Sequence, residues 1–99
     1  MFARLTTTVL GSDEPDAAAE IVERILPTLQ SLDGFKGILV LADETTGVFH
    51  GLTLWESAAA MERSEPVARG IREAETRARH VITQETATFR VVAFHLTRS

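Results

Sequence analysis

The sequence predicts an α+β fold of the ferredoxin-like plan, with elements in the order β-α-β-β-α-β. Three observations carry this prediction. Strand-like segments rich in threonine and apolar residues begin and end the chain. Two internal segments repeat apolar residues at helical spacing. A short turn at residues 43–47 separates two further strand-like runs, which predicts an antiparallel hairpin. Together they predict a four-stranded antiparallel sheet with two helices.

The first strand and the first helix occupy residues 2–34. Threonines and apolar residues alternate over residues 2–10, which predicts a strand with one less apolar face. Ser12 or Asp13 is the predicted helix cap, and Pro15 fits the first turn. Apolar residues then recur to residue 32, so we expect an amphipathic helix that is kinked or restarted at Pro27. Gly34 should end it in the left-handed conformation.

The rest of the chain predicts a hairpin, a second helix and a last strand. Residues 35–42 and 48–55 form the predicted hairpin. Ser57 is the expected cap of the second helix, which Ser64, Glu65 and Pro66 should interrupt and restart. His80 is the simplest cap for the end of that helix. The last strand is predicted over residues 86–96, where both alternating sets of side chains are apolar.

Length and composition narrow the class of protein. A chain of 99 residues predicts one domain over residues 1–99. The absence of cysteine excludes a disulfide and fits a cytoplasmic location. The net charge of −4 argues against a nucleic-acid partner. Residues 2–9 are too short, and too interrupted by Arg4 and threonines, for a signal peptide or a membrane span. We therefore expect no nucleic-acid partner and no membrane partner.

The apolar pattern also predicts a homodimer. Two helices cover one face of such a sheet, and a face open to water should be polar. The second and fourth strands are apolar on both faces, which would leave an apolar patch in water. A second copy packed sheet to sheet would cover this patch. Alternatively, residues 79–85 fold over part of it. The sequence leaves open which alternate set of side chains faces the helices.

Three segments resemble the antibiotic biosynthesis monooxygenase family, a branch of the dimeric α/β-barrel superfamily. They are residues 32–37 (LDGFKG), residues 52–57 (LTLWES) and the interruption at residues 64–66. The resemblance covers most of the chain, and its motifs mark turns and caps. It implies a ferredoxin-like domain that pairs sheet to sheet as a dimeric α/β barrel. Members of the family include cofactor-independent oxygenases of aromatic polyketides and quinols, haem-degrading monooxygenases, and proteins without an assigned reaction.

The chain departs from the catalytic patterns of that family. In the haem-degrading branch, an Asn on the first strand and a Trp and a His in the second helix carry the chemistry. This chain has no Asn. The position equivalent to the family's Trp is occupied by Ser64 or Met61, and the position equivalent to its His by Ala74 or Ile71, depending on the alignment. The polyketide oxygenases are associated with Asn, Trp and Tyr near the substrate, and this chain has no Tyr. Haem degradation is therefore not expected. The resemblance predicts the fold, but it does not predict a catalytic mechanism.

The function implied by the resemblance is a cofactor-independent monooxygenase. It would hold a small hydrophobic or aromatic substrate in a pocket between helices and sheet. An electron-rich substrate can supply its own electrons to oxygen, so the protein would desolvate it, orient it and move a proton. His50 lies among apolar neighbours of its strand and is the candidate catalytic residue; a hydrogen-bonded core or interface histidine is the alternative. The alternative function is a non-catalytic dimeric ligand-binding or accessory protein with the same cavity.

Five further residues are candidates for the ligand pocket: Thr7, Leu52, Trp55, Met61 and Ile71. Trp55 either anchors the packing at the end of its strand or forms a wall that stacks on an aromatic ligand. The three histidines are far apart in the sequence and show no metal-ligand spacing, so no metal site is predicted.

Overall fold

In a computed structural model, the chain forms its elements in the predicted order. The structure describes residues 1–9, 15–79 and 82–97. The predicted caps Ser12, Asp13 and His80 lie outside these residues. The elements are β1 (Phe2–Val9), α1 (Pro15–Gln30), β2 (Phe35–Asp43), β3 (Val48–Trp55), α2 (Ala58–Arg79) and β4 (Ile82–Arg90). The predicted β-α-β-β-α-β order is confirmed.

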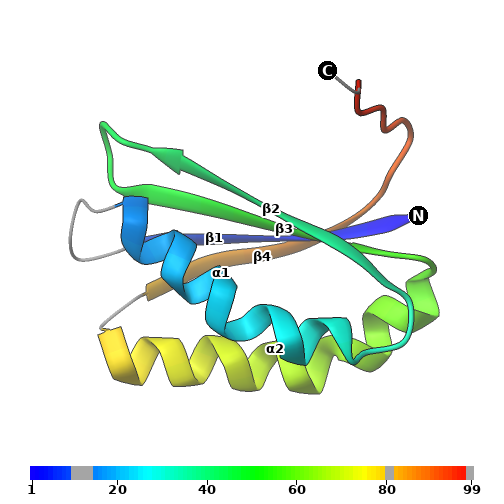
Figure 1. Cartoon of the computed structure of the whole chain (residues 1–99), viewed down its shortest axis with the longest axis horizontal. Coiled ribbons are helices and arrows are strands. Elements are labelled where there is room, and N and C mark those ends of the chain that lie inside the picture. The colour runs from blue at the N-terminus through cyan, green and yellow to red at the C-terminus, as the bar shows by residue number, and fades with distance from the viewer. Residues whose placement is uncertain (10–14, 80–81, 98–99) are drawn as a thin grey trace.

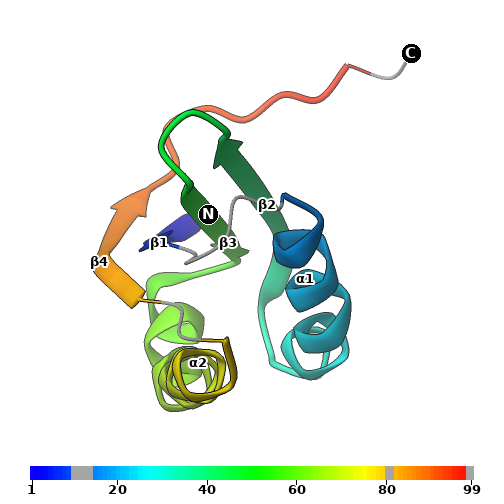
Figure 2. The ribbon, with the colours of Figure 1, turned by 90° about the vertical axis from the view of Figure 1, so that its left-hand side faces the viewer.

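The strands form one antiparallel sheet in the order β2-β3-β1-β4. Both helices pack side by side on one face of this sheet, and among the described residues no helix covers the other face (Figures 1 and 2). This is the two-layer ferredoxin-like arrangement that the sequence predicts. In the part of the chain that the structure describes, no helix is long and apolar enough to cross a membrane.

The turn between α1 and β2 depends on Gly34. Its φ of 81° lies in the left-handed region, as predicted from the sequence. A Cβ atom added at this position would lie 2.5 Å from the Cβ of Ala60, so there is no room for a side chain. The Gly34 carbonyl also accepts a hydrogen bond from the Glu56 N–H at 2.7 Å. Gly34 therefore fixes the end of α1 close to the start of α2.

The second helix begins as predicted but is not interrupted. Ser57 Oγ accepts a hydrogen bond from the Ala60 N–H at 3.1 Å, which is the expected cap. The predicted break at residues 64–66 is wrong, because α2 continues through Pro66; α1 likewise continues through Pro27. A proline removes one intrahelical hydrogen bond, and tertiary packing can hold the helix together around it.

The predicted range of the last strand needs a correction. The strand β4 ends at Arg90, and residues 91–97 lead away from the helices without regular structure (Figure 2). The Val91 N–H still donates to the Met1 carbonyl at 2.9 Å. Because β4 pairs with β1, and β1 begins at Phe2, no strand among the described residues lies beside the chain beyond Val91. The apolar side chains of Val92, Phe94 and Leu96 are therefore exposed.

The best-packed part of the core surrounds Trp55, which has no exposed surface. Phe35 meets its ring edge-on, with ring centroids 5.4 Å apart. The indole N–H donates to Thr53 Oγ1 at 3.0 Å. Leu29 and Met61 complete the contacts from the two helices. Trp55 thus has the surroundings expected of a packing anchor at the end of β3.

Candidate functional site

A cavity of about 160 Å³ lies between the two helices and the sheet. Its apolar side comes from α1, β2 and β3, because the apolar stripe of α1 faces the sheet. Its more polar side comes from β1 and α2. The apolar lining residues are Ala18, Ile21, Val22, Ile25, Leu29, Ile38, Val40, Phe49, Ala68 and Ile71. The cavity therefore suits a ligand with an apolar body and a polar end.

The polar side of the floor is set by the strand register. Arg4 lies opposite Thr53, and Thr6 lies opposite Gly51, so these positions share the face of the sheet that the helices cover. Thr8 belongs to the same alternate set on β1 and also lines the cavity. A charged residue and a row of hydroxyl groups thus point toward the helices, where a purely structural core would place apolar side chains.

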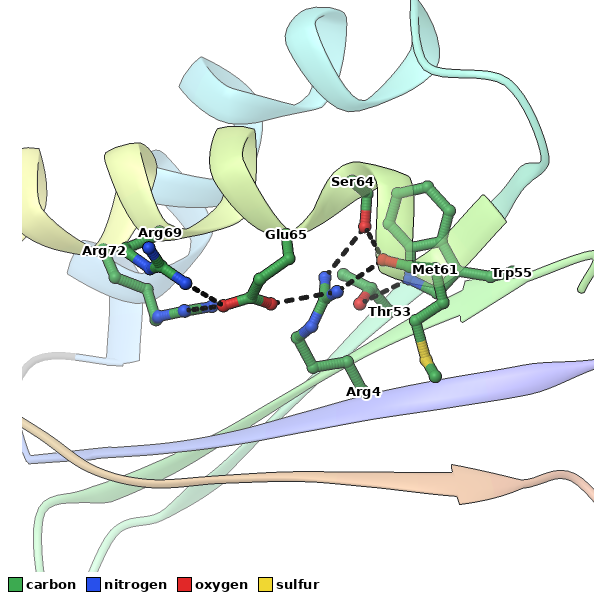
Figure 3. Close-up of polar contacts among 8 residues, drawn as sticks. All are labelled: Arg4, Thr53, Trp55, Met61, Ser64, Glu65, Arg69 and Arg72. Atoms are coloured by element: carbon green, nitrogen blue, oxygen red, sulfur yellow. Dashed lines mark hydrogen bonds and ion pairs between the residues drawn. The ribbon is translucent and has the colours of Figure 1, made fainter. Parts of the chain in front are cut away.

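Arg4 is a buried charge held by several contacts (Figure 3). Its side chain is 4% exposed. Nη1 donates to Ser64 Oγ at 3.1 Å, and Nη2 donates to the Met61 carbonyl at 2.7 Å. The guanidinium carbon lies 5.8 Å from the centre of the Trp55 ring. These contacts fix the guanidinium between β1 and the first half of α2.

Glu65 supplies the negative charge beside Arg4. Its Oε2 lies 3.1 Å from Arg4 Nη2, and its Oε1 accepts a hydrogen bond from Arg72 Nη2 at 2.6 Å. Arg69 Nη2 lies farther away, 3.9 Å from Oε1 (Figure 3). Burial raises the pKa of Glu65, but the hydrogen bond from Arg72 and the charges of Arg4, Arg72 and Arg69 outweigh it and hold this pKa below its ordinary value. Glu65 is therefore a carboxylate at neutral pH.

The effects of burial and of nearby charges on the pKa combine differently at Arg4 than at Glu65. Burial lowers the pKa of Arg4, Glu65 opposes this effect, and the nearby charge of Arg72 lowers the pKa further. Burial and the charge of Arg72 together outweigh the opposing charge of Glu65. In addition, the buried Nε of Arg4 has no hydrogen-bond acceptor among the described residues. A negative charge brought close to Arg4 by a ligand would offset the effects of burial and of Arg72 on this cation.

A second ion pair links the two helices beside the cavity. Arg24 of α1 donates to Glu75 Oε1 of α2, through Nη2 at 2.5 Å and through Nε at 3.2 Å. Glu75 also lines the cavity. Because Arg24 is partly exposed, this pair lies toward the solvent side of the helix layer.

Comparison with known proteins starts from the sequence. No family model matches the chain. Two uncharacterized proteins of Mycobacterium tuberculosis, MT2634 and Rv2557, are each 32% identical to it over 74 residues, which cover 74% of this chain. The chain spans about one third of the length of these relatives, since the match covers 33% of each.

The solved structures are more informative about the fold. A protein of Deinococcus radiodurans, provisionally named an antibiotic biosynthesis monooxygenase, matches over 100% of both chains with a TM-score of 0.72 and 16% identity. SnoaB of Streptomyces nogalater, a cofactor-independent oxygenase, matches over 94% of both chains with a TM-score of 0.71 and 14% identity. The chain has the antibiotic biosynthesis monooxygenase fold. The resemblance drawn from the sequence is thereby confirmed for the fold.

Within this monooxygenase fold, the predicted pocket residues separate into three groups. Ile71 lines the cavity. Trp55 and Met61 are buried in the adjoining core and do not line it. Thr7 and Leu52 belong to the opposite face of the sheet, since their strand neighbours Thr6, Thr8, Gly51 and Thr53 line the cavity instead. A shift of one residue along a strand moves a side chain to the other face, which explains this difference.

His50 also lies on the face away from the cavity. Its Nδ1 and Thr7 Oγ1 are 3.2 Å apart and share a hydrogen bond. The residues directly opposite it are Thr7 on β1 and Leu41 on β2, and Leu41 is exposed. A ligand in the helix–sheet cavity is therefore separated from His50 by the sheet. Its catalytic role stays a prediction, while its surroundings favour the interface alternative.

Sequence reasoning missed Arg4 and its carboxylate. Glu65, Arg69 and Arg72 have the spacing of a solvated helix face, which hides their contact with β1. The available signal was Arg4 itself, a charged residue on a strand otherwise made of threonines and apolar side chains. Among the described residues, no group of three or more possible metal ligands is present.

Proposed function

We propose that this protein is a cofactor-independent monooxygenase that oxidises a small, electron-rich aromatic substrate in the helix–sheet cavity. The observation that carries the proposal is the cavity itself, with apolar walls from α1 and a charged residue, Arg4, at its floor. The fold shared with SnoaB, a cofactor-independent oxygenase, supports the same class of reaction. A largely apolar site removes water from the part of the substrate that it covers and holds the substrate for reaction with oxygen.

A quinol illustrates the proposed chemistry. The reduced ring gives electrons to molecular oxygen, and one oxygen atom forms a new bond to a ring carbon. The other oxygen atom leaves as water with two hydrogen atoms from the substrate, so the products are a hydroxyquinone and water. No external reductant is needed, because the quinol itself is oxidised. The protein's part is to bind the ring, exclude bulk water and favour the electron-rich form of the substrate.

We further propose that the protein acts as a homodimer through the open face of the sheet. This face carries apolar residues from all strands, and Leu39, Leu41 and Phe89 on it are each more than half exposed, at 51%, 55% and 51%. The tail adds Val92, which is 85% exposed. An apolar patch of this kind is typical of an interface. The cavity lies on the other face, so each copy would keep its own site.

Oxygen uptake with a panel of quinols tests the reaction. Methylhydroquinone and 1,4-naphthohydroquinone would be supplied with labelled oxygen gas, superoxide dismutase and catalase. The masses of the products would then be measured by mass spectrometry. We expect a hydroxyquinone with one labelled oxygen atom, formed faster than in buffer alone. Formation of unlabelled quinone at the buffer rate with every quinol would contradict the proposal.

A cavity-filling pair of variants connects the activity to the site. Ala68 of α2 lines the cavity, whereas Ala59 of the same helix is exposed. Ala68→Phe should fill much of the space and lower uptake at least about tenfold, since ligand pockets depend on shape and volume. Ala59→Phe makes the same chemical change outside the cavity and should leave uptake unchanged. Equal rates in the two variants would place the reaction elsewhere.

The alternative function is ligand binding without chemistry. One observation favours it: no histidine occurs among the described residues that line the cavity, and histidine is the side chain best suited to move protons near neutral pH. Tight binding of quinols in the cavity, lost in Ala68→Phe, together with oxidation at the buffer rate would support this alternative.

A further inference from the structure

The charge distribution at the cavity identifies one end of the ligand. Arg4, Arg69 and Arg72 surround the single carboxylate of Glu65, and two of these arginines, Arg4 and Arg72, also line the cavity. Arg4 and Arg72 share the one carboxylate of Glu65, so this end of the cavity carries an excess of positive charge, whereas the charge of Arg69, which is 63% exposed, is screened by water. The carboxylate that lines the cavity, Glu75, is bound to Arg24 on the other helix. The site therefore attracts negative charge.

One hydrogen-bond donor of Arg4 has no acceptor among the described residues. Its Nη atoms are bound to Ser64, Met61 and Glu65, while its buried Nε has no acceptor among the described residues. Buried donors are normally satisfied, and charge-assisted hydrogen bonds to a guanidinium are stronger than neutral ones. An oxygen anion close to Arg4 and Arg72 would provide the missing negative charge.

The volume of the cavity limits the body of the ligand. At about 160 Å³, it is similar to an engineered apolar cavity of about 150 Å³ that binds benzene. A single aromatic ring with a small substituent fits this space.

We propose that the cavity selects single-ring aromatic anions, with the ring against the apolar wall of α1 and the negatively charged oxygen beside Arg4 and Arg72. This deepens the proposed function and rests on it for the use of the same cavity. For a phenolic substrate, binding as the phenolate raises the electron density of the ring before oxygen arrives. Arg4 and Arg72 are thus positioning and specificity residues for the ionised form.

Binding of matched probes tests the preference directly. The first pair is 4-methylbenzoate and 4-methylbenzyl alcohol, which differ mainly in charge. Calorimetry at neutral pH should show at least about tenfold tighter binding of the benzoate, because a hydrogen bond to a charged group contributes about 1.5–3 kcal/mol. The second probe is 4-nitrophenol, whose absorbance reports its ionisation. Its apparent pKa should fall when it binds.

Charge variants give the sharper test, because their expected effects have opposite signs. Glu65→Gln removes the competing carboxylate and should tighten binding of 4-methylbenzoate severalfold. Arg72→Gln removes a cation from the lining and should weaken it by about tenfold. Glu62→Gln makes the same change as Glu65→Gln at an exposed position of α2 that does not line the cavity, and should change binding less than about twofold. Melting curves would verify that each variant is folded.

Several results would overturn the inference. Equal affinity for the benzoate and the alcohol would show that the cations do not select charge. Weaker benzoate binding in folded Glu65→Gln would show that the carboxylate only orders the site. These results can be told apart from a failure of the oxygenase proposal. Anion-selective binding without oxygen uptake would contradict the oxygenase proposal and support anion selection. Turnover of quinols without anion selectivity would support the oxygenase proposal and contradict anion selection.

Discussion

The two faces of the sheet are built from alternate residues of the same strands, and on β1 they carry opposite chemistry. The face under the helices holds Arg4, Thr6 and Thr8 from β1, and the open face holds Leu5 and Val9 from that strand. A monomeric antiparallel sheet usually shows the reverse, with apolar residues inside and polar residues toward water. The difference supports the two proposals made above, a ligand site on the covered face and an interface between copies on the open face.

Energetics sharpen this contrast. A buried charge is costly unless it is paired and hydrogen-bonded, and Arg4 retains an incomplete set of partners. Exposed leucines on the open face also lose the stabilisation that burial would give. Both features cost stability in the isolated chain. The proposed ligand on one face and the proposed second copy on the other would recover it.

The largest expected effect comes from the packed end of the covered face. Trp55→Ala should lower the free energy of unfolding by about 3–5 kcal/mol, because it leaves a large hole in a fully buried region. Leu41→Ala on the open face should cost less than about 1 kcal/mol in dilute protein, since Leu41 is 55% exposed. Urea denaturation of both variants measures the difference. Similar losses for the two would show that the faces do not differ as the structure indicates.

The next effect concerns the open face. Leu41→Asp places a charge on the apolar open face, on the edge strand β2, and should raise the dimer dissociation constant at least about a hundredfold, because an unpaired charge would be buried in the proposed interface. Sedimentation equilibrium at low micromolar concentration is the measurement. Thr45→Asp, in the exposed turn between β2 and β3, adds the same charge outside the patch and should leave the dimer intact. A wild-type protein that sediments as a 10.9 kDa monomer would refute the sheet-to-sheet interface.

The comparison of faces also shows how far the sequence determines the fold. Periodicity, turn residues and caps correctly predict the element order, the left-handed Gly34 and the Ser57 cap, because these depend on local chemistry. The end of β4 depends instead on where β1 begins, and this is a non-local fact. The apolar sequence of residues 91–96 resembles a strand whether or not a neighbouring strand exists.

The site was less predictable for a related reason. Alternation identifies two sets of residues on a strand, but it does not state which set the helices cover when both are partly apolar. Thr7 and Leu52 were therefore assigned to a pocket that Thr6 and Thr53 line. The contact between Arg4 and Glu65 joins residues that are far apart in the chain, so spacing on the helix predicts only solvated charges.

A smaller effect should appear in the pH dependence of stability. The pKa of Glu65 is below its ordinary value in the folded state, so the ionised carboxylate stabilises the fold. This contribution is present above about pH 4.3, the ordinary pKa of glutamate, and is lost as the pH falls through the lowered value. The difference in melting temperature between wild type and Glu65→Gln should therefore shrink on acidification below about pH 4. Glu62→Gln measures the general effect of removing a carboxylate from α2; the same trend there would exclude a specific role for Glu65.

The smallest effect is expected at His50, and it decides whether chemistry occurs on the covered or the open face. His50→Gln keeps a polar group that can still bond to Thr7 Oγ1 and removes the imidazole that would act as a general base. Because the sheet separates His50 from the cavity, quinol oxidation per folded molecule should change less than about threefold, whereas loss of a general base typically costs about a hundredfold or more. The change should instead appear in dimer stability, since His50 lies beside the exposed Leu41. A hundredfold loss of oxygen uptake with an unchanged melting temperature and an intact dimer would restore His50 as the base and move the reaction to the open face.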